Sequence, residues 1–258
     1  QREGLGRALG YSDAISISGE LKSMFNPNPI IQVFPIAENQ FCYVIDDFLN
    51  DPSSCVELAV THRADFREAA SNAYPGIELP MSQDINQALI NFFSTYINRR
   101  FGVRKIKGSY SRLSMVTKKP EQLMPCQWIC HRDGVTVPAD ERMLASVLYL
   151  FKDESLGGTS IYRPTADQKR TASLIHDANC MSATSFSYKY GITPGFMTES
   201  NAWFEKVLSI GARWNRMVIY DSMVFHSGDI LRPEAMTDNP RTGRLSLNGF
   251  YRGRRSLV

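Results

Sequence analysis

Hydrophobic positions in the N-terminal third of the chain follow two different periods. Residues 30–34 and 41–45 form short β-type runs. Asp51-Pro52 then supplies a helix N-cap followed by proline at the first helical position, which predicts a helix to about residue 66. A second helix is predicted from Ser82 to a stop at Gly102, with apolar residues at helical spacing at Ile85, Leu89, Phe92, Phe93, Tyr96 and Ile97. We expect the two helices to brace one face of a sheet.

From position 105 onward the pattern changes to short β-rich runs separated by Gly, Pro and Asp. The candidate strands are residues 106–117, 127–131, 144–151, 159–162, 216–220, 223–227 and 243–251. Many short strands at this spacing are typical of a sandwich or jelly roll. The fold class predicted is therefore mainly β with flanking α-helices, built on a double-stranded β-helix (jelly-roll) core.

Two stretches interrupt this β pattern. Residues 164–194 have no clear period and are predicted to form an irregular lid, because long loops in compact domains tend to be binding segments. Residues 199–210 are predicted as a further helix. At the other end, residues 1–29 close on Asn26-Pro27-Asn28-Pro29 and are expected to be a tail, which leaves 30–258 as a single domain.

The amino-acid composition limits the classes of partner that we expect this protein to bind. The 258 residues include 29 Lys and Arg against 26 Asp and Glu, a net charge of +3 that gives no electrostatic reason to expect nucleic acid or membrane. Five cysteines at irregular spacing do not indicate a disulfide framework, so we expect a cytoplasmic protein. No stretch approaches the roughly 18 apolar residues that a membrane span needs. We expect a small-molecule partner, and the sequence leaves a homodimer open.

A candidate metal site combines His131 and Asp133 with the distant His226. If residues 127–133 are extended, alternate side chains share a face, so His131 and Asp133 converge on one point. Asp221-Ser222 supplies turn chemistry for a hairpin that would deliver His226. A lone histidine is typical of a hydrogen-bonded turn or a satisfied core position. Two imidazoles and one carboxylate together can hold iron(II) and leave open positions.

A competing zinc site would use Cys126 and Cys130 with His131, because thiolate and imidazole are good zinc ligands. Neighbouring positions 130 and 131 on a strand point to opposite faces, however, and no second cysteine pair completes four ligands. We therefore predict that these cysteines are buried and unliganded.

A candidate anion site follows near the C-terminus. Residues 244–248 alternate strictly, which places Arg244, Ser246 and Asn248 on one face of a strand. A barrel-facing arginine can take a carboxylate with its planar fork, and Ser246 would add a hydroxyl donor. The competing interpretation is an exposed arginine on an edge strand.

With these residues the chain resembles the iron(II)- and 2-oxoglutarate-dependent dioxygenases. The resemblance rests on His131-x-Asp133, His226 and Arg244-x-Ser246. The apolar run 148–151, followed by the Gly-Gly-Thr turn at 157–159, is similar to a hydroxylase pattern. Two further runs, Gly-Gly-Thr-x-x-Tyr-Arg at 157–163 and Gly-Arg-Leu at 243–245, are similar to those of an uncharacterised bacterial branch. The resemblance covers roughly residues 105–252.

The resemblance implies that His131, Asp133 and His226 bind Fe(II), that 2-oxoglutarate chelates the metal, and that Arg244 and Ser246 receive its distal carboxylate. It further implies that O2 is consumed and that succinate and CO2 accompany hydroxylation. Related halogenases lack the carboxylate at the position of Asp133, so its presence argues against halogenation. Arg244 follows His226 by 18 positions where about ten is usual, so Arg232 and Arg241 remain alternatives.

Substrate contacts are expected at Gln127, on the ligand face of the predicted strand, and at Tyr162 and Arg163 after the Gly-Gly turn. Residues Tyr110, Arg112 and Ser114 alternate on the preceding strand, and either face could be inward.

Three functions stay open at this point. The first is hydroxylation of an unactivated C–H of a small molecule such as an amino acid or natural-product intermediate. The second is the same chemistry on a protein side chain or nucleobase, motivated by basic clusters near positions 99–107 and 252–255. The third is a cupin-like metal-binding module without oxygenase activity.

Overall fold

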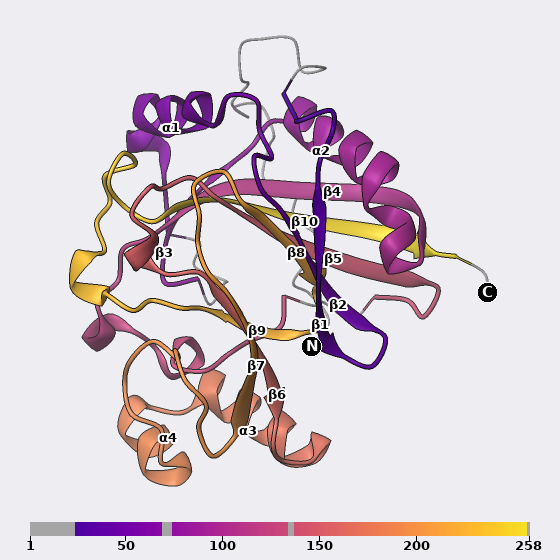
Figure 1. Cartoon of the computed structure of the whole chain (residues 1–258). Coiled ribbons are helices and arrows are strands. Elements are labelled where there is room, and N and C mark those ends of the chain that lie inside the picture. The colour runs from indigo at the N-terminus through magenta and orange to yellow at the C-terminus, as the bar shows by residue number, and fades with distance from the viewer. Residues whose placement is uncertain (1–23, 69–73, 134–136, 257–258) are drawn as a thin grey trace.

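Two antiparallel sheets face each other in the computed structural model, which describes residues 24–68, 74–133 and 137–256 (Figure 1). Within these residues the large sheet has the strand order β1 (Ile31–Ala37), β2 (Gln40–Ile45), β8 (Met217–Asp221), β5 (Glu141–Tyr149), β10 (Leu245–Arg255), β4 (Val103–Val116) and β3 (Gly76–Pro80). The small sheet has the order β7 (Phe204–Ile210), β6 (Thr159–Pro164) and β9 (Phe225–Gly228). One buried apolar cluster, which includes Val44, Tyr149 and Val218 from the large sheet and Ile161 and Ile210 from the small one, fills the space between them.

The strand connections are those of a jelly roll. Consecutive strands alternate between the sheets, from β5 to β6 and from β8 to β9 and back to β10, so that each sheet contains strands distant in sequence. A single antiparallel bridge between His131 and His226 extends the small sheet by one more position beside β9. The predicted double-stranded β-helix core with flanking helices is confirmed.

Two helices, α1 (Pro52–Thr61) and α2 (Gln83–Tyr96), cover the outer face of the large sheet (Figure 1). The sequence signals act as predicted. Asp51 accepts from two backbone amides at the start of α1, and Ser82 accepts from Ile85 N at the start of α2. After a short 3-10 turn, η4 (Asn98–Phe101), Gly102 adopts a left-handed conformation at φ 62°, which glycine reaches without steric cost. Among the described residues, no helix is long and apolar enough to cross a bilayer.

The segment expected to be a tail is partly built into the core. Phe25 bridges Leu49 in antiparallel fashion and packs on the rings of Phe48 and Phe92, at centroid distances of 5.0 and 5.3 Å. Residues 24 and 25 therefore pack on the core instead of forming a tail, and the ring of Phe25 lies against α2 and the loop before α1. Residues 1–23 lie outside the described part of the chain.

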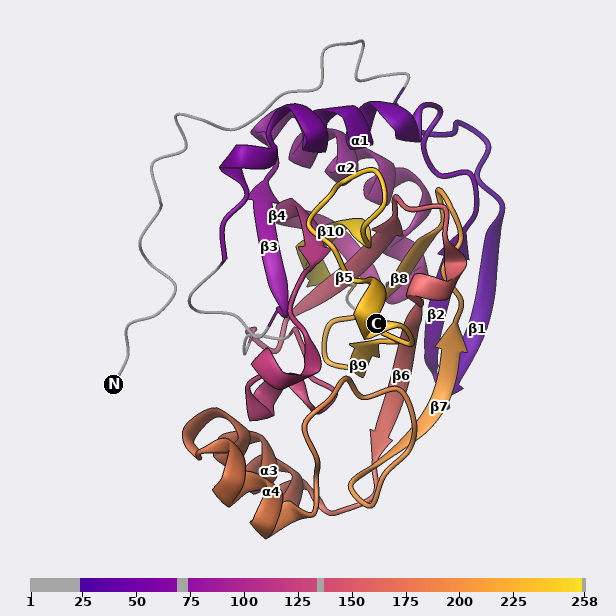
Figure 2. The ribbon, with the colours of Figure 1, turned by 90° about the vertical axis from the view of Figure 1, so that its left-hand side faces the viewer.

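The predicted irregular lid over residues 164–194 is instead a helical pair, α3 (Gln168–Cys180) and α4 (Ala183–Tyr190). Asp167 and Ser182 cap the two helices, and Leu174 and Phe186 are fully buried. Figure 2 shows these helices at the end of the molecule opposite α1 and α2, with the sheets between. The period was missed because most of their surface is polar, so few apolar residues mark the inner face.

The predicted helix at 199–210 is wrong, because residues 199–203 contain only bends and residues 204–210 form β7. This strand pairs with β6 along most of its length, and Val207, Leu208 and Ile210 are residues that favour strands. Sequence analysis also missed β3, which pairs with β4 at the edge of the large sheet.

The predicted strand at 127–131 is wrong: the chain there forms a short 3-10 turn, η6 (Pro125–Gln127), then a bend at 128–129 and a single bridge at His131. Pro125 opens the turn, and the side chain of Gln127 accepts from Met124 N and closes it. The remaining short 3-10 turns of the described chain are η3 (Arg63–Asp65), η5 (Pro120–Gln122), η7 (Glu154–Leu156) and η8 (Pro233–Ala235).

Candidate metal centre

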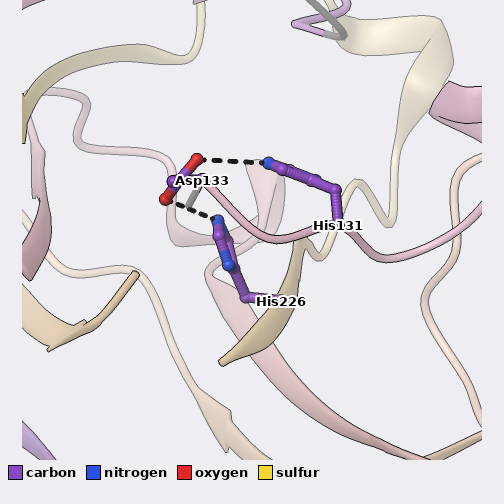
Figure 3. A group of neighbouring side chains, drawn as sticks. All are labelled: His131, Asp133 and His226. Carbon is purple, nitrogen blue, oxygen red and sulfur yellow. Dashed lines mark ion pairs between the residues drawn. The ribbon is translucent and has the colours of Figure 1, made fainter. Parts of the chain in front are cut away.

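The side chains of the three predicted ligands come together in one group (Figure 3). Asp133 lies between the two imidazoles, with Oδ1 3.5 Å from His131 Nε2 and Oδ2 3.2 Å from His226 Nε2. One ligand atom from each residue falls within 4.8 Å of the others. The side chain of His226 is 6% exposed and that of His131 is 45% exposed, so the triad has one buried side and one side open to solvent.

The backbone fixes the relative position of the two histidines. His131 and His226 exchange both backbone hydrogen bonds, each 2.9 Å long, and Asp133 N donates to Ser222 O. The expected hairpin before His226 is wrong, because β8 and β9 belong to different sheets and the turn at 221–224 carries the chain from one to the other. This crossover places His226 against the His131 segment.

Hydrogen bonding selects the nitrogen that His226 presents to a ligand. Nδ1 of His226 lies 3.0 Å from Val224 O, and because a carbonyl oxygen only accepts, Nδ1 carries the proton. Nε2 is then directed at Asp133. A ring held through its second nitrogen in this way is the usual arrangement of a metal-binding histidine.

The charges of the triad depend on one another. Burial by itself raises the pKa of Asp133, but the two imidazoles, His226 above all, bring it far below its usual range. Burial opposes a charge on His226, yet the adjacent Asp133 carboxylate raises the pKa of His226. Partial desolvation lowers the pKa of His131, His226 and Arg112 add to this effect, and Asp133 opposes it. The carboxylate is therefore ionised at neutral pH.

The donor set fits a divalent transition metal. Two imidazole nitrogens and one carboxylate on one side of an ion leave positions open for other ligands, the pattern of non-haem iron(II) oxygenases. Oδ2 of Asp133 is buried and lies 3.2 Å from His226 Nε2. Because the proton of His226 is on Nδ1, both of these atoms are acceptors, and a bound cation would satisfy them. No cysteine of the described chain joins this group; Cys130 is buried as predicted, whereas Cys126 is only partly buried.

Arg244 occupies the barrel interior close to the Gly-Gly turn. Its side chain is buried, Nε donates to Gly157 O at 3.1 Å and Nη2 to Gly158 O at 2.7 Å. It forms no ion pair with any described residue, and a buried cation without an anion is unfavourable. The site therefore fits an anionic ligand such as a carboxylate.

The two glycines of the turn make this arrangement possible. A Cβ on Gly157 would lie 1.5 Å from Asp229 O, and one on Gly158 would lie 1.9 Å from Ile210 O. Gly157 also adopts φ 91°. Only glycine allows the chain to pass this close to its neighbours and still present both carbonyl oxygens to Arg244.

Ser246 and Tyr149 complete the surroundings of Arg244. They are register partners on β10 and β5, and Ser246 also faces Ser114 on β4. The Tyr149 hydroxyl donates to Thr159 Oγ1 at 2.8 Å, and the Arg244 guanidinium lies 5.9 Å from the Tyr149 ring. Burial raises the pKa of Tyr149 to about 12, although Arg244 lowers it in part. Sequence analysis missed Tyr149, which the strand register with Ser246 identifies.

The two alternative arginines, Arg232 and Arg241, form ion pairs on the protein surface. Arg232 pairs with Asp153 and Glu234, and its side chain is 50% exposed. Arg241 pairs with Glu57 on α1. Both lie in the long loop between His226 and Arg244. Lys119, which precedes η5, donates to the carbonyls of three residues of this loop, Pro233, Glu234 and Met236.

The three predicted substrate residues contact other parts of the protein. Gln127 closes its own turn through Met124 N. Tyr162 lies on the outer face of the small sheet in the cluster with Leu174 and Phe186, because its register partner Phe225 points away from the side of His226. Arg163 is 63% exposed and pairs with Glu205. Trp128, next to Gln127, is buried and donates to Leu123 O.

Three residues of the basic clusters weighed as a nucleic-acid footprint form ion pairs with acidic side chains. Lys107 and Arg252 both pair with the buried Glu141, and Arg254 pairs with Asp140.

Solved structures with a similar chain path include several oxygenases. A prolyl-4-hydroxylase of Pseudomonas putida is 14% identical with a TM-score of 0.41, covering 83% of this chain and 92% of that one. SnoK, a non-haem α-ketoglutarate-dependent carbocyclase from nogalamycin biosynthesis, is 11% identical with a TM-score of 0.46, covering 86% and 85%. HygX from Streptomyces hygroscopicus, solved with nickel and 2-oxoglutarate, is 9% identical with a TM-score of 0.44, covering 84% of each chain.

No curated protein matches the chain in sequence. A family model does match, over residues 27–251, and its description is a family of unknown function, DUF6445. Because the match spans most of the sequence, the chain belongs to the DUF6445 family.

Proposed function

We propose that this protein is an iron(II)- and 2-oxoglutarate-dependent dioxygenase that hydroxylates an unactivated C–H of a small molecule, such as an amino acid or a natural-product intermediate, and releases succinate and CO2. One observation carries the proposal. The same barrel contains the triad of His131, Asp133 and His226 and the buried Arg244, whose charge suits an anionic ligand. A metal site alone would fit many proteins, whereas this pair of sites fits a metal with a dicarboxylate co-substrate.

Each residue has a defined task in this proposal. His131, Asp133 and His226 would hold the iron, which supplies oxygen activation when it is bound with 2-oxoglutarate. Val224 O holds the proton of His226 on Nδ1 and so keeps Nε2 free for the metal. Arg244 and Ser246 would bind the distal carboxylate of 2-oxoglutarate, with Arg244 held in place by two carbonyl oxygens of the glycine turn.

The carboxylate of Asp133 supports hydroxylation over halogenation, because it occupies the ligand position that a halide would need. The low pKa of Asp133 keeps it ionised at neutral pH and available as a ligand. The modest net charge of +3 supports a small-molecule substrate over nucleic acid.

Anaerobic spectroscopy tests the proposal directly. Adding Fe(II) and 2-oxoglutarate to the wild-type protein should give a visible metal-to-ligand charge-transfer band. His131→Ala should lose the band, and His176→Ala, an exposed histidine on α3, should keep it. Absence of the band in the wild-type protein would refute the proposal.

Two further measurements separate the alternatives. Tightly held zinc or nickel without succinate formation would favour a cupin-like binding module. Binding to single-stranded DNA or RNA that weakens steeply with salt would favour a nucleic-acid substrate.

A further inference from the structure

A strip of polar side chains crosses the inner face of the large sheet beyond Arg244. On β10, Ser246 and Asn248 follow Arg244 at alternate positions, and on β4 their register partners are Ser114 and Arg112. β4 and β10 lie side by side in the large sheet (Figure 1). The strip therefore runs from the proposed 2-oxoglutarate site to a second arginine.

Two atoms of this strip, Ser114 Oγ and Asn248 Oδ1, are buried without a hydrogen bond to any described residue. Buried polar atoms are almost always satisfied, because leaving one unpaired costs about 1–3 kcal/mol. Arg244 and Ser246 are assigned to 2-oxoglutarate, which leaves Asn248 and its neighbour Arg112 for another ligand.

The guanidinium of Arg112 is held in a fixed position. Its Nε lies 2.9 Å from Oε1 of Glu78 on β3, and the side chains of Arg112 and Glu78 are 15% and 6% exposed, respectively. Its guanidinium carbon lies 5.2 Å from the ring centroid of Phe250 and 5.9 Å from that of Tyr74. The two terminal nitrogens donate to no described residue. One edge of the guanidinium is thus anchored, and the other edge keeps its donors for a ligand.

The strip continues into an apolar surface. Tyr110 and Phe250, register partners one step beyond Arg112 and Asn248, stack with centroids 6.3 Å apart and planes at 16°. Both side chains are partly exposed. An arginine fork next to a flat aromatic surface suits a molecule with an acidic head and a hydrocarbon body.

We propose that Arg112, with Asn248 beside it, binds a carboxylate of the primary substrate, so that the substrate is an organic acid such as an amino acid. This inference rests on the proposed function. Glu78 orients the guanidinium, and the rings of Tyr110 and Phe250 contact the substrate's carbon skeleton.

The test uses ligand-observed NMR on protein loaded with Ni(II) and 2-oxoglutarate. The probes are a panel of free L-amino acids and short aliphatic and aromatic carboxylic acids, each paired with its carboxamide. At least one acid should bind the wild-type protein, and its amide should bind about tenfold or more weakly, because charge-assisted hydrogen bonds to a carboxylate are lost. If no acid binds, or if amides bind equally well, the inference is overturned.

Variants assign the effect to Arg112. Arg112→Leu combined with Glu78→Gln removes both charges, so that no unpaired carboxylate is left buried, and should weaken acid binding about tenfold or more. Arg112→Lys keeps the charge without the fork and should fall between. Arg163→Leu, at an exposed arginine on the other sheet, should bind like the wild-type protein. Unchanged acid binding in the double variant overturns the inference.

The charge-transfer band separates this inference from the proposed function. The double variant should form the Fe(II) and 2-oxoglutarate band with unchanged 2-oxoglutarate affinity, which also reports that it is folded. A band missing from the wild-type protein rejects the proposed function. A normal wild-type band with 2-oxoglutarate affinity lost in the double variant instead assigns Arg112 to the co-substrate and overturns the inference.

Discussion

At the scale of single residues, the site is defined by buried charged groups that suit a ligand of opposite charge. Arg244 is buried with carbonyl oxygens, and no carboxylate of the described residues, as its hydrogen-bond acceptors, and Oδ2 of Asp133 faces the unprotonated Nε2 of His226 at 3.2 Å. Natural proteins rarely bury such groups unless a ligand offsets the cost. The two groups therefore point to a cation beside Asp133 and an anion beside Arg244.

Replacing Arg244 should affect the co-substrate and leave the metal site intact. We expect Arg244→Leu to raise the Kd for 2-oxoglutarate at least about 30-fold, because removing one partner of a buried charge pair costs about 2–5 kcal/mol. Titration of the anaerobic Fe(II) protein with 2-oxoglutarate measures this. Arg241→Leu, at an exposed arginine that pairs with Glu57, is the matched control. Equal affinities in the two variants would show that the anion site lies elsewhere.

At the scale of elements, the ligand-bearing loop depends on a helical pair for its position. Residues 123–131 form only one bridge to a strand, yet Leu123, Trp128, Ile129 and Cys130 are buried in a cluster with α3 and α4. The Trp128 and Phe186 rings meet edge to face with centroids 6.0 Å apart. In the absence of a strand, packing against these helices holds His131 and Asp133.

Truncating Phe186 should therefore loosen the metal site from a distance. We expect Phe186→Ala to destabilise the protein by about 3–5 kcal/mol and to weaken Fe(II) binding about tenfold, because the loop loses its packing partner. Denaturant unfolding and metal titration measure the two effects, and hydrogen exchange should accelerate over residues 123–131. Tyr188→Ala, at a 94% exposed position on the same helix, should change neither. A destabilised variant with full metal affinity would contradict this role.

At the scale of the whole molecule, the triad joins two segments that are far apart in the chain. His131 and Asp133 lie on the loop that packs against α3 and α4, whereas His226 lies on β9 of the small sheet. A metal ion bound by His131, Asp133 and His226 would connect the loop and β9, and the three ligands are close enough to bind it only in the folded state. Ligand binding should therefore raise the stability of the entire fold.

A thermal shift measures this linkage. With Ni(II) and 2-oxoglutarate each at 100 times its Kd, we expect a gain of about 2.7 kcal/mol for each ligand and a rise in Tm of about 5 °C or more. His131→Ala should show no rise at the same concentrations. A rise that persists in this variant would mean that the ions bind elsewhere.

Much of the fold follows from local signals in the sequence. Asp51-Pro52 and Ser82 begin helices where they are predicted, and the Gly157-Gly158 turn lies beside Arg244. The errors fall where tertiary contacts outweigh local preference. Residues 204–210 become a strand because β6 offers a pairing edge, and α3 and α4 lack a strong apolar pattern because only a narrow side of each is buried.

The sequence by itself determined the ligand types, since two histidines, one aspartate and an Arg-x-Ser pair carry their chemistry in their side chains. It also determined the jelly-roll class, because short alternating strands favour two packed sheets. Only the tertiary structure decided which groups meet. The convergence of His131 with His226 requires a crossover between sheets, the choice of Arg244 over Arg232 and Arg241 depends on burial, and Arg112 reaches the inner face through strand register. Spacing along one chain cannot encode such contacts, because they arise from the packing of distant segments.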